Sequence, residues 1–230
     1  MYMYGFNMYY FLFMIPGLII TMWAQWKMKS TFSKYEKVHT AQGLTGAQAA
    51  RMILDRNGLQ NVQVQQVGGK LTDHYDPRTN VVSLSQATYN APTIGGVGVA
   101  AHECGHAIQH AVGYGPIKVR TAIVPIANWG SKLSIPLIFV GFILNVLGLV
   151  YLGILLFGLA VLFQLVTLPV ELNASRRAIE TLNESGMVTA DESVGVRKVL
   201  TAAAMTYLAA LLTSLLQLLY YLMLALGRRR

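Results

Sequence analysis

One short segment holds the residues best suited to chemistry. Residues 102–106 read His-Glu-Cys-Gly-His, with two histidines four positions apart. In a helix, His102 and His106 would lie one above the other on one face, where both imidazoles could bind one zinc ion. Glu103 would lie beside that ion and could take a proton from a metal-activated water. This pattern is typical of metal-assisted peptide hydrolysis.

The neighbours of this motif are small or apolar, which predicts a buried helix. Residues 93–101 read Thr-Ile-Gly-Gly-Val-Gly-Val-Ala-Ala, and Gly105, Ala107 and Ile108 follow within the motif and after it. Buried imidazoles and carboxylates are costly to desolvate unless something pairs with them, and a zinc ion would pair with all three. The alternative is a pair of core histidines bonded to backbone carbonyls.

A hydrolytic zinc site needs a third protein ligand. His110 would lie roughly 12 Å from His102 along a helix, too far to share one tetrahedral ion with it. Glu171 follows an uncharged run at 135–170, and a lone carboxylate at the end of such a run is a functional candidate. It could instead favour a helix N-terminus after Pro169. Cys104 would point away from the histidine face and is not expected to be a ligand.

Three ordered motifs resemble a known family. They are Asp-His-Tyr-Asp-Pro-Arg at 73–78, the segment from His102 to His110 followed by Gly-Tyr, and Val-Glu-Leu-Asn-Ala-Ser-Arg-Arg-Ala at 170–178. Together they resemble the bacterial YugP-type neutral zinc metallopeptidases, a family of membrane proteases. The resemblance implies a gluzincin-like site with one catalytic zinc ion, held by His102, His106 and Glu171, and Glu103 as the base.

The chain departs from a wider pattern at one position. Membrane gluzincins usually have aspartate four residues after the ligand glutamate, whereas Ser175 stands there in this chain. Groups that hold a ligating imidazole from behind affect metal affinity and activity. We therefore expect the imidazole support to differ here.

Composition predicts an integral membrane protein. Hydrophobic residues make up 54% and charged residues 12% of the chain, against roughly 25% charged in soluble domains. The net charge of +8 comes from Lys and Arg scattered near the ends of apolar segments, which indicates positive-inside flanks and contact with anionic lipid. This spacing does not resemble a nucleic-acid-binding module. The single cysteine excludes an intrachain disulfide.

These signals predict an α+β membrane protein, mostly helical, with a small gluzincin-like core and a short β-sheet. Lys27 and Lys29 follow the first apolar segment, so its N-terminus is expected outside and the active site on the cytoplasmic side of the membrane. The resemblance implies a bacterial plasma membrane. Residues 135–170 would span about 54 Å as one helix, nearly two hydrocarbon cores, so a hairpin with its tip at 148–153 is expected. The expected regions are an N-terminal transmembrane helix at 1–26, the core at 27–132, the transmembrane hairpin at 133–170, the Glu171 helix and a connector at 171–203, and an apolar helix, spanning or interfacial, at 204–230.

The core should also bind a substrate backbone. Residues 62–67 alternate like a strand, and a second strand at 81–85 is expected as a sheet edge that pairs with an extended, membrane-associated or unfolded protein.

A non-catalytic scaffold with a structural metal is the alternative, but such a site needs no carboxylate like Glu103 beside the metal. The oligomeric state is left open. Candidates for support of the ligands or contact with substrate are His110, His74, Tyr75, Arg176 and Ser175.

Overall fold

The computed structural model describes residues 8–227 and divides the chain into two compact units. The helical unit contains the residues up to Gln25, Val119–Leu168 and the residues from Thr206 on. The mixed unit contains Trp26–Lys118 and Pro169–Met205. Parts of two expected regions, residues 1–7 and the three arginines at 228–230, lie outside the described residues.

Four long helices supply the helical unit and continue into the mixed one. They are α1 (Met8–Tyr35), α5 (Gly115–Ile143), α6 (Leu147–Glu184) and α7 (Ala190–Gly227), and all four are long and apolar enough to cross a membrane. With a three-stranded sheet elsewhere in the chain, they confirm the predicted α+β membrane class.

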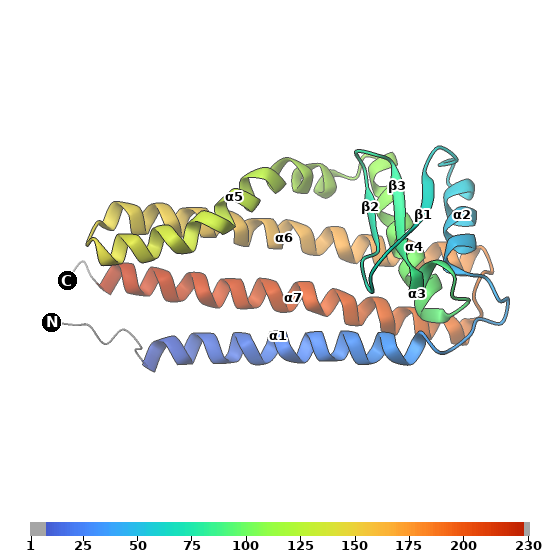
Figure 1. The fold of residues 1–230 in the computed structure, drawn as a ribbon, viewed down its shortest axis with the longest axis horizontal. Coiled ribbons are helices and arrows are strands. Elements are labelled where there is room, and N and C mark those ends of the chain that lie inside the picture. The colour runs from blue at the N-terminus through green and yellow to red at the C-terminus, as the bar shows by residue number, and fades with distance from the viewer. Residues whose placement is uncertain (1–7, 228–230) are drawn as a thin grey trace. The chain divides into compact units, whose positions relative to one another are not determined.

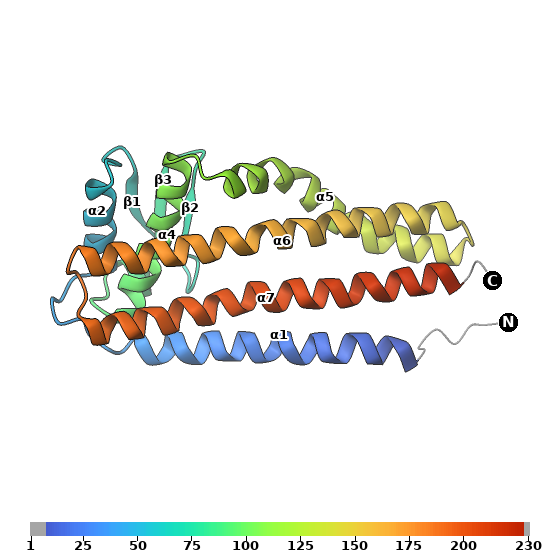
Figure 2. The same cartoon turned by 180° about the vertical axis from the view of Figure 1, so that it is seen from behind.

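Within the helical unit, the helices run side by side (Figures 1 and 2). The hydroxyls of Thr21 and Thr213 join α1 to α7 at 2.9 Å, and the rings of Phe157 and Tyr221 join α6 to α7 with centroids 5.6 Å apart. Large apolar side chains on the outer faces remain exposed, among them Phe139 at 65%. A surface of this kind suits lipid contact.

The hairpin has its turn a few residues earlier than expected. Because α5 ends at Ile143 and α6 begins at Leu147, the turn falls at 144–146, and the expected tip at 148–153 is wrong. Asn145 takes a positive φ of 56°, a conformation that asparagine tolerates. Gly153 instead lies inside α6, where a Cβ would come within 2.8 Å of the Ser134 carbonyl oxygen. This glycine therefore serves close helix packing, which the sequence pattern does not distinguish from a turn.

The boundaries of two other helices also differ from expectation. The part of the expected connector from Ala190 on and the last apolar segment form one continuous helix, α7. Its start is fixed by reciprocal bonds, from the Glu192 amide to the Thr189 hydroxyl at 3.3 Å and from the Thr189 amide to the Glu192 carboxylate at 2.8 Å. At the other end of the chain, α1 runs past residue 26 and includes Lys27 and Lys29.

The sheet of the mixed unit places its most apolar strand in the centre. β1 (Gln63–Val67) pairs in parallel with β3 (Val81–Ser85), and β2 (His74–Asp76) pairs antiparallel with the other side of β3. The expectation that residues 81–85 form an edge is therefore wrong. All five residues of β3 are buried, which is the pattern of a central strand covered on both faces. Among the strands of residues 8–227, β1 and β2 each have one edge without a neighbouring strand.

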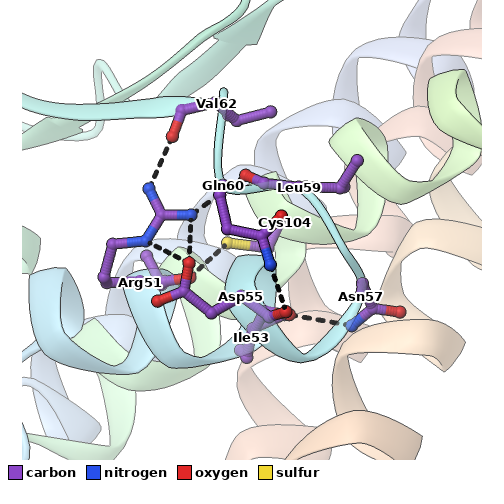
Figure 3. Close-up of polar contacts among 9 residues, drawn as sticks. Arg51, Ile53, Asp55, Asn57, Leu59, Gln60, Val62 and Cys104 are labelled. Atoms are coloured by element: carbon purple, nitrogen blue, oxygen red, sulfur yellow. Dashed lines mark hydrogen bonds and ion pairs between the residues drawn. The ribbon is translucent and has the colours of Figure 1, made fainter.

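Short helices complete the mixed unit. They are α2 (Gly46–Arg56), α3 (Gln86–Tyr89) and α4 (Ile94–Ala111), and α4 packs against α2, β2 and β3. Figure 3 shows how Arg51 of α2 bonds Asp55 and the carbonyls of Leu59 and Val62, at 3.0, 3.0 and 2.6 Å. These bonds hold the loop that leads into β1 against α2.

Candidate metal centre

The metal motif lies on α4, which is buried as expected. Thr93 caps the helix, since its hydroxyl accepts a bond from the Gly96 amide at 3.2 Å. Glu103 and His106 are each 9% exposed, and most of the small residues around them are fully covered. Buried polar side chains on such a helix need partners, and for His106 one of these, Glu171, comes from α6.

A single glycine lets α4 approach α6 closely. A Cβ on Gly105 would stand 2.6 Å from the carbonyl oxygen of Ala174, so any larger residue would force the two backbones apart. Gly105 lies between the two motif histidines, and Ala174 lies three residues after Glu171. The close approach therefore brings the glutamate opposite the histidine pair.

The three expected ligands converge. Nε2 of His102 lies 3.2 Å and Nε2 of His106 lies 3.5 Å from Oε2 of Glu171, and all three donor atoms lie within 4.8 Å of one another. In a tetrahedral zinc site with bonds of 2.0–2.1 Å, neighbouring donors stand about 3.3 Å apart. Two imidazole nitrogens and one carboxylate oxygen at these separations fit zinc and leave a fourth position to a water or substrate.

Both imidazoles are held from behind. The Ser175 hydroxyl lies 3.1 Å from Nδ1 of His102, and Oε1 of Gln109 lies 3.0 Å from Nδ1 of His106. Each histidine is therefore engaged through Nδ1 and presents Nε2 to Glu171. The group behind His102 is thus a serine hydroxyl, and the group behind His106 is an amide oxygen.

Sequence reasoning did not identify Gln109 as part of the site. This residue is fully buried and lies three positions after His106 on α4. That spacing puts two side chains on one helical face and could have suggested the contact. Its partners on α6 could not be read from the sequence.

Charge at the centre favours a bound cation. Burial of the His106 ring opposes its protonation, but the hydrogen bond to Glu171 and the charges of Glu103 and Glu171 outweigh burial and raise the pKa of His106. The same negative charge that favours the imidazolium would favour a metal cation in its place.

The Cys104 thiol bonds the Ala50 carbonyl at 3.6 Å (Figure 3), and burial raises its pKa. Cys104 thus lies away from the donor group.

The remaining candidates are engaged elsewhere. His74 is exposed, with Nδ1 2.8 Å from the Thr72 carbonyl oxygen, and Arg176 is exposed, 3.8 Å from the Glu180 carboxylate. The sequence suggested both as possible aids to the substrate carbonyl, and these contacts do not direct them to the donor group.

Tyr75 and His110 form a pair. The Tyr75 hydroxyl donates to Oδ1 of Asn80 at 2.9 Å, and the centroid of its ring lies 5.6 Å from that of His110. His110 is outside the group of three converging donors. The pair links the edge strand β2 to the end of α4.

Comparison with known proteins agrees with the geometry. Residues 10–226 match the sequence model of the family described as "Putative neutral zinc metallopeptidase". The chain is 50% identical over 216 residues to a Bacillus subtilis (strain 168) protein named "Putative membrane protease YugP", and the match covers 94% of this chain and 96% of that protein. No solved structure matches the chain.

Proposed function

This chain belongs to the neutral zinc metallopeptidase family, and on that premise we propose that it is a zinc-dependent endopeptidase of a membrane. The observation that carries the proposal is the convergence of His102, His106 and Glu171 on one point, with Glu103 on the same helix as the histidines. The four helices that could span a membrane support the membrane location.

The donor set defines the chemistry that zinc would supply. His102, His106 and Glu171 would hold one ion, which when bound polarises the scissile carbonyl and lowers the pKa of a water toward about 7. Glu103 would accept the proton of the attacking water and pass it to the leaving amine. Burial of Glu103 keeps bulk water from competing for that proton.

Metal dependence tests the proposed function. We expect the purified protein to cleave an unfolded protein such as casein, to lose this activity with a zinc chelator, and to regain it when zinc is restored. The readout is fragment formation together with zinc content per chain. Cleavage that continues after the metal has been removed would disprove the proposed mechanism.

We propose that an extended substrate pairs with the free edge of β2. This strand packs against α4, which supports its choice over β1. Edge strands offer unpaired backbone groups to a peptide. Because backbone bonds to one neighbour alternate along a strand, methylation of successive substrate amides should raise KM at alternate positions only. A uniform effect along the peptide would argue against strand pairing.

Ser175 should contribute to metal binding through His102. Ser175→Ala removes the hydroxyl behind the ring, and we expect zinc affinity to fall by about tenfold, as for other groups that orient a ligating imidazole. The measurement is the zinc dissociation constant from chelator competition. Ser185→Ala is the matched control, since that hydroxyl bonds the Leu182 carbonyl instead. Equal affinities of the two variants would remove Ser175 from this role.

The site is proposed to open on the cytoplasmic side of a bacterial plasma membrane. The support is the positive charge that follows the first apolar segment at Lys27 and Lys29. If this is correct, the turn at 144–146 faces outside, because α5 and α6 form one hairpin. A periplasm-active reporter inserted after Asn145 should be active, and the same reporter inserted after Gly58 should be inactive. The reverse result would invert the topology.

A further inference from the structure

We propose that Gln109 is a positioning residue that fixes which nitrogen of His106 faces the metal and ties that imidazole to the helix carrying Glu171. The inference rests on the metal site proposed above. It comes from three bonds of one buried side chain: Oε1 to His106, and Nε2 to the Val170 carbonyl and to Oδ1 of Asn173.

The first step concerns the orientation of the Gln109 amide. A backbone carbonyl can only accept hydrogen bonds, so the Val170 oxygen, at 2.8 Å, requires the NH2 group of Gln109 on its side. The amide oxygen must then face His106, at 3.0 Å from Nδ1. Because an oxygen only accepts, Nδ1 must carry the proton, and Nε2 is left with the lone pair that a metal needs.

A second contact gives the same orientation independently. The Arg177 guanidinium can only donate, and its Nε lies 2.9 Å from Oδ1 of Asn173. The Asn173 amide must therefore turn its oxygen toward Arg177. The same oxygen accepts from Nε2 of Gln109 at 3.0 Å. The Val170 carbonyl can only accept and the Arg177 guanidinium can only donate. Together they determine the orientation of both side-chain amides.

The bonds also couple the two helices that carry the proposed ligands, beside the donor atoms. Gln109 lies one turn after His106 on α4, and Val170 directly precedes Glu171 on α6. Gln109 is fully buried, and its amide has partners on both sides. Satisfied buried networks rigidify their surroundings. The same side chain therefore sets the His106 ring and the position of the backbone beside Glu171.

The other histidine is held differently. The Ser175 hydroxyl, 3.1 Å from Nδ1 of His102, can rotate and act as donor or acceptor. It supports the ring without imposing a tautomer. Gln109 has no such freedom, so its loss should affect the metal more than the loss of Ser175.

The test compares two buried changes on the same helix. Gln109→Met keeps the length of the side chain and removes all three bonds, whereas Cys104→Ala alters α4 away from the donor group. We expect Gln109→Met to weaken zinc binding by about 10 to 100-fold in chelator competition, while Cys104→Ala stays near wild type. The visible absorption of the cobalt-loaded protein, which reports ligand geometry, should change in Gln109→Met only.

Two further variants keep the test decisive. Gln109→Glu retains an acceptor for Nδ1 of His106 and should recover most of the lost affinity, since carboxylates commonly support zinc-bound histidines. Should Gln109→Met fail to fold, Asn173→Ala is the alternative variant. It removes one of the two acceptors of the Gln109 NH2 group and should still bind zinc more weakly than Cys104→Ala.

The outcomes separate this inference from the proposed function. Zinc affinity and cobalt absorption unchanged in Gln109→Met, or an equal loss in Cys104→Ala, would overturn the role of Gln109 alone. Wild-type protein that binds no zinc would overturn the proposed function, and this inference with it.

Discussion

Glu103→Gln is expected to slow peptide cleavage strongly while leaving the zinc content unchanged. Glutamine has the shape of glutamate but does not accept a proton at neutral pH, so the attacking water loses its base. General acid–base catalysis contributes about 10² to 10⁴-fold, and kcat should fall by that factor. Glu103 lies outside the group of three converging donors, so metal binding should persist. The measurements are kcat and zinc per chain on the purified protein.

A carboxylate elsewhere in the mixed unit provides the control. Glu180→Gln neutralises an exposed side chain on α6 that is 3.8 Å from Arg176, and it should leave both quantities unchanged. Cleavage by Glu103→Gln at the wild-type rate, with zinc retained, would contradict the catalytic role. That result would favour a structural metal site and a scaffold function.

Glu171→Ala is expected to release the metal. It removes one of three donors and leaves two histidines, so zinc affinity should fall by more than the roughly 100-fold that loss of an outer partner can cause. Binding to the folded state stabilises it, by about 2.7 kcal/mol at a zinc concentration of 100 Kd. Zinc should therefore raise the Tm of wild type and not that of Glu171→Ala. Activity should be lost together with the metal.

The matched control is another buried carboxylate. Glu192→Gln disturbs the bonds at the start of α7, where Glu192 is 9% exposed and accepts from the Thr189 amide. This variant should lower stability but keep its zinc and the zinc-dependent rise in Tm. Undiminished zinc affinity in Glu171→Ala would exclude Glu171 as a ligand.

Much of the site could be predicted because it depends on local spacing. The two histidines and Glu103 lie within one helical turn, and helix periodicity alone places the imidazoles on one face. Glu171 could be selected because a lone carboxylate after an apolar run is costly without a partner. The predicted classes of element were right for the same reason, since apolar runs and alternation are local signals.

Contacts between distant segments could not be predicted in this way. Gln109 and Val170 are 61 residues apart, and no local pattern tells that the side chain of Gln109 reaches the backbone carbonyl of Val170. The close packing at Gly153 looks the same in sequence as a turn. The predicted place of β3 in the sheet was wrong for a similar reason. The sequence of a strand does not tell whether it has one neighbouring strand or two.

The sequence by itself determined the candidate metal ligands and the apolar character of the protein, because residue identity, helical spacing and composition are properties of the chain alone. The tertiary structure decided which atoms meet. It brought Glu171 to 3.2 and 3.5 Å from the two histidines, placed Gln109 and Ser175 behind their rings, and left β2 as the free edge near α4. These are outcomes of side-chain packing between helices and strands far apart in the chain, where fit in three dimensions determines the contacts.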